Sequence, residues 1–543
     1  MPILVRNLRL GLDEPIEALM PEIALRLGVS VEAIRAHAVV SRAVDARRRD
    51  IHFCYQVEVA LDEPPRRERA RLKRLREADA AWIEPQEDTT PRPGKTPLPA
   101  RPVVVGFGPG GMFAALRLAQ LGYKPLVLER GREIRRRHYD VLQRYYRERD
   151  FDPSSNLLFG EGGAGAYSDG KLYTRVNDPL GRYVLESFYQ HGADPDILIN
   201  TRPHVGSDRL PTICTHIRQK IESLGGDVLF DTSLVDIRLG DGKLTAIHVR
   251  GPRFGSQGEW LPTSPTILSI GHSARDTIRM LAARGVCIEP KPFQIGVRIE
   301  HPQEMIDRRQ YGQAAGHARL GPAEYHLVAR GAAGKFGDLF SFCMCPGGTI
   351  LPTNESPGRI ATNGASRSGR SSPFANAGLV ITLDPVELGL DALGGLAFQE
   401  QWECKAFEAT GGSYCVPAQR AIDYLKRRQS DGTLETSYPL GGQWADLRTL
   451  IPQQVADSLD RALPMLDKKF PGFAGGDALI TGPETRASSP IRMVREPSTR
   501  QALNIAGLFP VGEGAGYAGG IVSAAVDGVK SADKIIECYA PST

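Results

Sequence analysis

The order of hydrophobic and polar positions changes character several times along the chain. From residue 101, RPVVVGFGPGGMFAALRLAQLGYKPLVLERG places a short apolar run before a glycine turn, then apolar residues at helical spacing, then a second apolar run. Continuous short apolar runs are typical of strands buried on both faces of a parallel sheet. The pattern therefore predicts strand, turn, helix and strand. The same kind of order returns in TILSIGHSARDTIRMLAARG and, near the C-terminus, in GLFPVGEGAGYAGGIVSAAVDGVKSADKII.

Alternating patterns predict strands of another kind elsewhere. Residues 1–62 follow the order strand, helix, strand, strand, which predicts a small βαββ module. The segment GGDVLFDTSLVDIRLGDGKLTAIHVRG alternates as a pair of strands. Residues 63–98 begin with a basic run and end in a proline-rich stretch, so we expect an interdomain linker there.

The turn after the first apolar run has the spacing of a dinucleotide site. Gly106 permits the sharp turn, Gly108 lets the backbone approach a pyrophosphate, and Gly111 lets the helix pack closely on the strand. Glu129 ends the next predicted strand, 18 residues beyond Gly111, where a carboxylate accepts hydrogen bonds from ribose hydroxyls. A glycine-rich turn without a ligand does not account for this acid. The cofactor-binding residues predicted here are Gly106, Gly108, Pro109, Gly110, Gly111, Glu129 and Arg130.

A second glycine-rich turn indicates which dinucleotide binds. Gly512 and Glu513 follow an apolar run, and Gly519, Gly520 and Ile521 open an apparent helix. The Rossmann half of an NAD-binding dehydrogenase is self-contained, whereas a flavin extends well beyond the pyrophosphate. We therefore expect FAD, with Glu513 bonded to ribityl hydroxyls and the helix N-terminus directed at the electron-rich edge of the ring.

Several further motifs give the sequence a family resemblance. Together with the turns above, FGEGGAGAYSDGKL, FQIGVRIEHP, SFCMCPGG and ETRASSPIR resemble a family known mainly as uncharacterised FAD-dependent dehydrogenases, with a glutathione reductase or p-hydroxybenzoate hydroxylase type of FAD fold. The similarity runs along the whole chain. One departure from the wider fold is Glu513, where many relatives have Asp. The further cofactor-binding positions that the resemblance implies are Gly162, Gly163, Ser168, Lys171, Leu234 and Gly271.

The resemblance also implies roles for these positions. Gly162 and Gly163 would approach the flavin ring, the backbone of Leu234 would meet adenine, and Gly271 belongs to the turn that closes the FAD domain. Two interpretations of Lys171 stay open, since it either offsets phosphate or reduced-flavin charge or is a surface lysine.

The elements and motifs together predict an α/β fold. A Rossmann-like FAD-binding domain is expected from residues 99–290 and 481–543, with an α+β substrate lobe, residues 291–480, inserted between the two parts. The small βαββ module, 1–62, and the linker, 63–98, precede it. The chain has 543 residues, which is too long for a single core.

Composition and charge narrow the classes of function. The net charge of +4 is small against 67 basic and 63 acidic residues, so it indicates no general affinity for nucleic acid or membranes. The N-terminus has no long apolar segment, and the 8 cysteines are scattered, so we expect reduced thiols and a cytoplasmic location. We expect no metal site and no membrane partner. The sequence does not predict an oligomeric state.

Catalytic candidates lie in the predicted second lobe and at its border. An arginine facing a flavin can bind a carboxylate or an anionic oxygen, and chain continuity brings the ETRASSP segment close to the last FAD motif. A salt-bridged strand is the alternative for FQIGVRIEHP, and His272 is expected to be structural. The catalytic candidates are Arg298, Glu484 and Arg486.

Cys343 and Cys345 form a CxC pair on a predicted strand. A redox dithiol is one interpretation, but disulfide reductases of this broad fold use a longer spacing on the helix after the first motif. That helix has no cysteine here. We therefore interpret the pair as buried small hydrophobic residues.

The predicted function is that of a FAD-dependent oxidoreductase, a dehydrogenase or reductase that moves hydride between FAD and a small organic substrate. No second GxGxxG follows a strand, so NAD(P)H is expected to dock only transiently if it is the donor. Two alternatives are a flavin monooxygenase and a flavin-dependent enzyme acting on tRNA or other RNA. The RNA alternative depends on residues 66–76, where seven of eleven positions are Lys or Arg without interleaved aromatic residues. A third is FAD that serves only a structural or sensing purpose.

Overall fold

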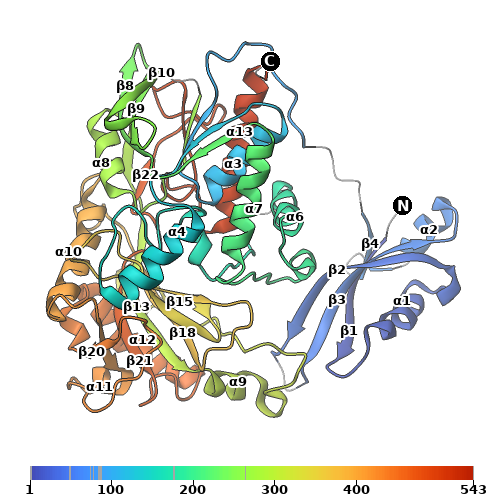
Figure 1. The fold of residues 1–543 in the computed structure, drawn as a ribbon. Helices are drawn as coiled ribbons and strands as arrows, with labels where there is room; N and C mark the ends of the chain where they lie inside the picture. The colour runs from blue at the N-terminus through green and yellow to red at the C-terminus, as the bar shows by residue number, and fades with distance from the viewer. Residues whose placement is uncertain are drawn as a thin grey trace.

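Figure 1 shows the protein as a computed structural model that describes residues 3–47, 50–73, 75–76, 79–83, 89–174, 178–262 and 265–541. A small N-terminal module lies beside a larger body, which consists of a Rossmann-type part and a second lobe below it in this view. The predicted α/β class is confirmed. Within the described part of the chain, no helix combines the length and the apolar character that a bilayer crossing needs.

Five short strands form the parallel sheet of the Rossmann-type part. Their order is β23-β11-β5-β6-β7, so the strands of the first motif are central and the last strand of the chain is at the edge. Buried apolar side chains from both faces of this sheet continue into two hydrophobic cores. The strands are β5 (Val103–Val105), β6 (Leu126–Leu128), β7 (Asp227–Leu229), β11 (Thr266–Leu268) and β23 (Leu508–Pro510).

Two helices that follow glycine turns lie together against this sheet. They are α3 (Pro109–Gln120), after β5, and α13 (Ile521–Cys538), after β23. A Cβ atom on Gly528 would lie only 2.0 Å from the carbonyl oxygen of Gly110, so the helices cross at backbone contact. The other helices of this part are α4 (Ile134–Tyr139), α5 (Tyr146–Glu148), α6 (Leu180–Gln190), α7 (Leu210–Ser223) and α8 (Arg275–Ala283).

The predicted paired strands form an antiparallel sheet at the top of Figure 1. It has the order β10-β9-β8, from β8 (Ser233–Gly240), β9 (Lys243–Gly251) and β10 (Gly255–Pro262). A further two-stranded ladder joins β12 (Ile288–Pro290) to β22 (Ile491–Met493). The chain therefore leaves the Rossmann-type part beside the place where it returns.

The second lobe is built on a seven-stranded sheet of order β14-β15-β18-β13-β21-β19-β20. Its core joins apolar side chains of β13 and β18 to the buried face of α12. The strands are β13 (Phe293–Pro302), β14 (Val328–Ala329), β15 (Leu339–Cys345), β18 (Phe374–Leu383), β19 (Val416–Arg420), β20 (Gly442–Trp444) and β21 (Leu479–Glu484), with a separate hairpin of β16 (Gly348–Pro352) and β17 (Thr362–Ser366). The helices are α9 (Gln303–Tyr311), α10 (Gly394–Ala409), α11 (Ala421–Leu425) and α12 (Gln453–Lys469).

Strand β21 corrects the predicted end of this lobe. We expected the chain to return to the FAD-binding domain at residue 481, but β21 pairs with β13 and β19 inside the lobe and continues to Glu484. An apolar strand close to a glycine motif looks the same in sequence whichever sheet it joins. Glu484 therefore belongs to the second lobe.

The N-terminal module has the predicted strand, helix, strand, strand order. Its elements are β1 (Ile3–Gly11), α1 (Leu19–Leu27), β2 (Ile34–Asp45) and β3 (His52–Leu61). The expected linker departs from prediction, because it supplies α2 (Pro65–Leu72) and β4 (Ala80–Trp82), and β4 pairs with β1 to give the sheet order β2-β3-β1-β4. Part of the basic run and of the linker lies outside the described residues, and an RNA-binding role for the run stays a prediction.

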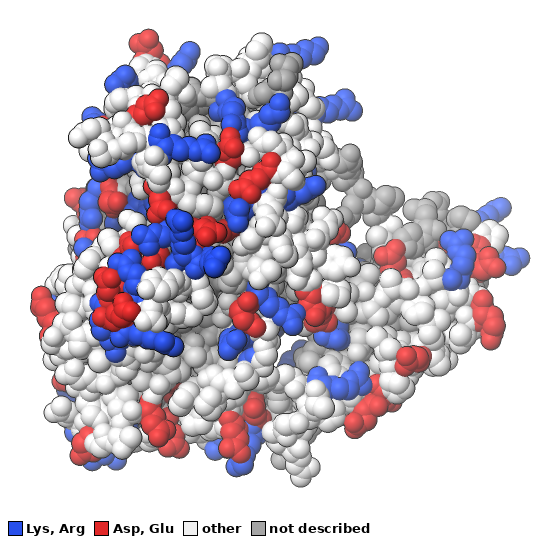
Figure 2. Space-filling model, viewed as in Figure 1, with Lys and Arg blue, Asp and Glu red and all other residues white. Residues whose placement is uncertain are grey.

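One contact between the module and the main body lies at the end of β2. The backbone N–H of Arg42 donates to the carbonyl of Ile199, and Thr201 donates back to Arg42. The Arg42 guanidinium also pairs with Asp196 at 2.7 Å. On the face shown in Figure 2, basic and acidic side chains intermingle over the main body, as the small net charge predicts.

Candidate functional site

Glycine loops from four parts of the chain meet at the carboxyl ends of the parallel strands. A Cβ atom on Gly163 would lie 2.8 Å from the Cα atom of Gly108. One on Gly514 would lie 2.5 Å from the carbonyl oxygen of Gly271. Any side chain at these contacts would push two backbones apart. The structure therefore brings the GxGxxG turn, the GEGGAG loop, the IGHSARDT turn and the GEGAG loop together in pairs.

Two helix N-termini face this same edge of the sheet. The N-cap residues Gly108, before α3, and Gly520, before α13, supply no side chain to the first backbone N–H groups. Cβ atoms on Gly519 and Gly520 would meet no described atom within 4 Å. Neither helix therefore has a side-chain cap on its first N–H groups, and the start of α13 faces open space, which suits an anion or an electron-rich group.

Glu129 connects the first motif to the GEGGAG loop. Its carboxylate accepts backbone hydrogen bonds from Phe107 (2.8 Å), Gly131 (2.9 Å) and Gly160 (2.9 Å), and only 4% of the residue is exposed. Two of these bonds reach Oε1 and one reaches Oε2. Because each carboxylate oxygen accepts two hydrogen bonds, Oε2 retains a position for a further donor such as a ribose hydroxyl.

Arg137 holds the GEGGAG loop from beneath, a role that sequence reasoning missed. Its fully buried guanidinium donates to the carbonyls of Asn156 (2.7 Å), Glu161 (2.6 Å) and Gly163 (2.8 Å) and stacks on the Tyr167 ring. Burial lowers the pKa of Arg137. Residues 135–138 read RRRH, and the sequence alone does not indicate which of the three arginines is buried.

Asp527 plays the corresponding role for the GEGAG loop and was also missed. Its Oδ2 accepts the backbone N–H of Gly512 at 2.8 Å, and Arg495 binds both carboxylate oxygens at 3.0 and 2.7 Å. Burial opposes ionisation of Asp527, but hydrogen bonds and charge from Arg495 and Arg500 outweigh it and lower the pKa. The loop is therefore anchored by an ionised side chain of α13.

Glu513 of the GEGAG loop lies beside His272 of the IGHSARDT turn. Their closest approach joins Glu513 Oε1 to His272 Nδ1 at 3.5 Å. Burial raises the pKa of Glu513 to about 7, against the opposing charges of Lys291 and Arg486. Burial and nearby arginines lower the pKa of His272 to about 3, so its imidazole is neutral. At neutral pH Glu513 is able both to hold and to accept a proton.

The remaining predicted cofactor residues have varied surroundings. Arg130 stacks on the ring of Phe159 and donates to Asp276 (3.0 Å) and Thr277 (2.7 Å). Leu234 lies in a hydrophobic core, two residues beyond Thr232, whose N–H donates to the carbonyl of Glu129. The Ser168 hydroxyl donates to the carbonyl of Gly165 at 2.8 Å.

Lys171 is not a surface lysine. Its ammonium nitrogen lies 2.5 Å from Asp169 Oδ2 and is 3.6 and 3.9 Å from the sulfur atoms of Cys345 and Cys343. The side chain is 14% exposed. The structure thus brings a lysine from the loop after GEGGAG against the CxC pair of the second lobe.

Arg298 and Glu484 form a fully buried ion pair between β13 and β21. Two hydrogen bonds of 2.6 and 2.7 Å join the guanidinium to the two carboxylate oxygens, and both side chains are 0% exposed. Arg298 also donates to Asn376 at 2.7 Å. Since its hydrogen bonds are directed to protein partners, this arrangement is the salt-bridged strand that the sequence left as the alternative.

Arg486 belongs to a larger buried ionic cluster between the Rossmann-type part and the second lobe. It binds Glu355 at 2.9 Å, while Arg275 at the start of α8 binds Glu355 at 2.9 Å and Glu403 of α10 at 2.7 and 2.9 Å. Arg486 is 3% exposed, yet its Nε and Nη2 have no described hydrogen-bond partner. Buried N–H groups of this kind usually have partners, so these two are available to donate to a ligand oxygen.

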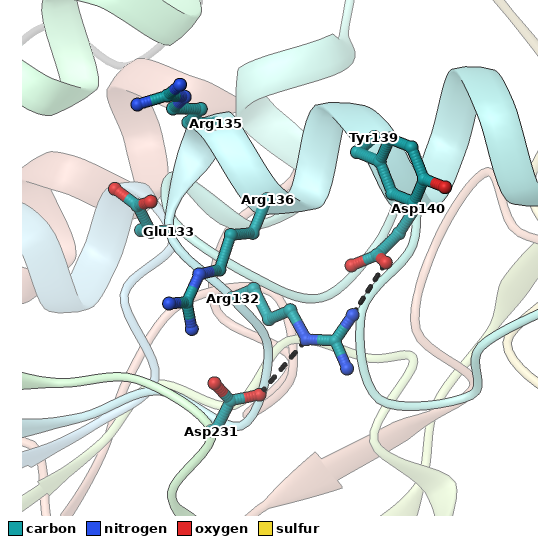
Figure 3. A pocket seen from close by; sticks show the side chains of 7 residues that line it. All are labelled: Arg132, Glu133, Arg135, Arg136, Tyr139, Asp140 and Asp231. Atoms are coloured by element: carbon teal, nitrogen blue, oxygen red, sulfur yellow. Dashed lines mark hydrogen bonds and ion pairs between the residues drawn. The ribbon is translucent and has the colours of Figure 1, made fainter.

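A surface pocket of about 660 Å³ is lined mainly by α4 and the residues on either side of it (Figure 3). Arg132 crosses it and binds Asp140 at 2.6 Å and Asp231 at 3.4 Å, as the dashed lines show. Its lining is strongly charged, unlike the backbone-lined space at the glycine loops. The lining residues are Arg132, Glu133, Arg135, Arg136, Tyr139, Asp140 and Asp231.

One group in the described residues has metal-ligating side chains close together, Asp45, His52 and Cys54 in the N-terminal module. Arg47 already binds both oxygens of Asp45, at 2.9 and 2.5 Å. The group is therefore an exposed ion pair with two polar neighbours, and we assign no metal to it.

Two family models match parts of the chain, and several solved structures are similar to it. Residues 292–487 match the family described as FAD-dependent protein, C-terminal domain-like, and residues 2–60 match a Domain of unknown function (DUF8436). Quinol fumarate reductase from E. coli is similar at 13% identity, covering 81% of this chain and 70% of that one, with a TM-score of 0.37. Glycine oxidase from Bacillus cereus is similar at 12% identity, covering 80% and 94%, with a TM-score of 0.32. At such scores these structures support no statement on activity.

The Rossmann-type sheet and the match of residues 292–487 make the chain similar to FAD-dependent α/β proteins. An uncharacterized protein of Clostridium beijerinckii is 40% identical over 543 residues, which is 99% of each chain. The chain belongs to the same family as that protein. The glutathione reductase or p-hydroxybenzoate hydroxylase type of FAD fold stays a prediction.

Proposed function

We propose that the chain binds FAD across the meeting glycine loops and acts as an oxidoreductase on a small organic substrate. The observation that carries this proposal is the convergence of two open helix N-termini and the Glu129 carboxylate at one edge of the sheet. When bound, FAD supplies the transfer of electrons or hydride. The protein contributes binding, orientation and charge.

Each loop has a chemical partner in such a ligand. The N–H groups at the start of α3 would hold the pyrophosphate. The free lone pair on Glu129 Oε2 would accept a hydrogen bond from a ribose hydroxyl. Glu513 would accept a ribityl hydroxyl, and the N-terminus of α13 would stabilise negative charge on the ring. Glycines at the loop contacts let these groups approach the ligand through bare backbone.

Arg486 is the residue best placed to act on a substrate or on the ring. Its two unpartnered N–H groups can hold an anionic oxygen. The neutral His272 contacts the backbone of Arg486 and the carboxyl of Glu513. These three residues would therefore line one side of the proposed site. Arg298 and Glu484 bind each other, so in this proposal they stabilise the second lobe.

The test is the flavin content of the purified protein and its affinity for FAD after removal and reconstitution. Gly519→Ala places a methyl group in open space on the ligand side, so the variant is expected to fold normally and to bind FAD about tenfold more weakly. The matched control is Gly476→Ala, whose Cβ also meets no described atom within 4 Å. Gly476 lies in the second lobe, between α12 and β21. A colourless wild-type protein that refuses FAD, or equal FAD affinity in both variants, would overturn the proposal.

Substrate class is addressed by anaerobic screening of metabolites for bleaching of the flavin. Bleaching by an organic substrate supports a dehydrogenase or reductase. Rapid reoxidation by O₂ with hydroxylation of the substrate would instead identify a monooxygenase.

A further inference from the structure

The CxC pair lies at a β-bulge with an unusual backbone. Strand β15 pairs regularly with β18 up to Phe342, and the register shifts before Cys345. Cys343 has φ +43°, in the left-handed region that residues other than glycine seldom adopt. Strain of this kind persists where the surrounding structure enforces it, and it is concentrated at functional sites. At this bulge both thiols reach one ammonium group, that of Lys171.

The two thiols differ in access. Cys345 is fully buried, whereas Cys343 is partly exposed. Cys345 Sγ lies 3.2 Å from the Cys343 carbonyl oxygen, and both sulfur atoms lie within 3.9 Å of Lys171 Nζ. An accessible sulfur with a buried sulfur behind it is the arrangement that dithiol chemistry needs.

Charge around the pair favours one thiolate. The Cys345 thiol, together with the positive charges of Lys171 and Arg298, lowers the pKa of Cys343 to about 6, although burial and Asp169 oppose this. Burial raises the pKa of Cys345 well above its ordinary value. Lys171 itself is fixed by Asp169, whose Oδ2 also lies 3.6 Å from His204 Nε2. These surroundings are not those of buried small hydrophobic residues.

We propose that Cys343 and Cys345 form a redox-active dithiol that exchanges with a disulfide substrate, with Lys171 as its positioning residue. The Cys343 thiolate attacks one sulfur of the substrate disulfide RS–SR, giving a Cys343–SR mixed disulfide and RS⁻. The Cys345 thiol then attacks the Cys343 sulfur and releases the second RS⁻, and its proton is taken up by a released thiolate. The products are the Cys343–Cys345 disulfide and two equivalents of reduced substrate thiol, one still to gain a proton from solvent.

This inference deepens the proposed function and rests on it for the return of electrons. Reducing the Cys343–Cys345 disulfide to two thiols takes two electrons and two protons, for which the reductant is reduced flavin. Lys171 connects the two sites, because the GEGGAG loop that precedes it touches the first dinucleotide turn at Gly108. The thiol chemistry itself is measurable without flavin.

Peptide mapping tests the dithiol directly. Trypsin cuts after Lys335 and Arg359, so both cysteines lie in one peptide, residues 336–359. Reduced protein is treated with oxidised glutathione, alkylated and digested. We expect a wild-type peptide two hydrogens lighter and without alkylation, and a Cys343–glutathione mixed disulfide in Cys345→Ser. A wild-type peptide alkylated at both cysteines after oxidation would overturn the proposal.

Alkylation rates test the role of Lys171. At pH 6 Cys343 is expected to react with iodoacetamide about tenfold faster than the exposed Cys538. A lowered pKa gives Cys343 a larger thiolate fraction, and this effect outweighs the lower intrinsic nucleophilicity of that thiolate. In Lys171→Met the two cysteines should react at similar rates. In Lys171→Arg, which keeps the positive charge, Cys343 should retain part of its faster reaction. Equal rates for Cys343 and Cys538 in the wild type, with the melting temperature unchanged across the variants, would contradict the proposal.

A third measurement separates this inference from the proposed function. Flavin content is determined first, and flavin-containing protein is then mixed anaerobically with dithiothreitol. Bleaching that is at least about tenfold slower in Cys343→Ser than in wild type, at equal flavin content, supports electron exchange between the pair and the flavin. Equal bleaching rates would overturn that exchange. A protein without flavin would overturn the proposed function, while peptide mapping still decides whether the dithiol exists.

Discussion

Gly528 of α13 and Gly110 of α3 touch through their backbones, although they lie near opposite ends of the Rossmann-type part of the chain. A Cβ atom at Gly528 would come within 2.0 Å of the Gly110 carbonyl oxygen. The two helix N-termini are therefore held in one fixed relation, and the space between them has one fixed width.

Gly528→Ala is expected to destabilise the protein by about 1–3 kcal/mol, because the methyl group must separate two backbones in a packed core. The gain of about 1 kcal/mol in helix propensity does not offset this. Gly181→Ala is the matched control, since its Cβ on α6 meets no described atom within 4 Å and only the propensity gain remains. Denaturant unfolding should show opposite signs for the two variants, and stabilisation by Gly528→Ala would refute the contact.

Glu484→Gln should destabilise the second lobe by about 3–5 kcal/mol, because it leaves the Arg298 charge buried and unpaired. The double variant Arg298→Met/Glu484→Leu should lose much less, since neither charge then remains in the core. Glu304→Gln breaks an exposed pair with Arg308 and should change the free energy of unfolding by less than about 1 kcal/mol. A loss as small as that of Glu304→Gln would show that Glu484 is not charged in the folded protein.

FAD affinity should rise with pH as Glu513 ionises. Its pKa is raised to about 7, so the carboxyl is mostly protonated at pH 6 and mostly ionised at pH 8. A ribityl hydroxyl donates to the ionised form, so binding should tighten by up to about tenfold between these values. Fluorescence titration of the flavin-free protein measures this. Glu513→Gln should give a flat profile, and an unchanged slope in that variant would assign the proton elsewhere.

Arg137→Lys should loosen the GEGGAG loop. A lysine cannot reproduce the planar fork that serves three carbonyls, so buried acceptors lose partners at a cost of about 2–4 kcal/mol. We expect faster proteolysis within residues 150–175 and weaker FAD binding. Arg136→Lys is the neighbouring control, because that side chain is exposed at the surface pocket in Figure 3. Equal proteolysis of both variants would place the loop's support elsewhere.

Glycine spacing and apolar runs were enough to predict the parallel sheet, both helix turns and the place of Glu129, because these depend on local backbone geometry. Arg137 and Asp527 could not be found in this way. Each is charged, and only the folded structure shows which member of a charged run points inward. The surroundings of the CxC pair could not be predicted for a related reason, since the bulge at Cys343 and the approach of Lys171 depend on contacts between distant segments. The same holds for β4 and β21, whose pairing partners are remote in sequence.

Two arginines and two glutamates lie at the boundary between the Rossmann-type part and the second lobe, and all four are buried: Arg275, Arg486, Glu355 and Glu403. An outward hinge motion of the lobe would separate Arg275 from Glu355 and Glu403 and expose these charges to water. A wide clamshell opening during turnover is therefore disfavoured. Reactants should enter and leave through motion of peripheral loops, and turnover should slow little when the two parts are covalently bridged across this boundary.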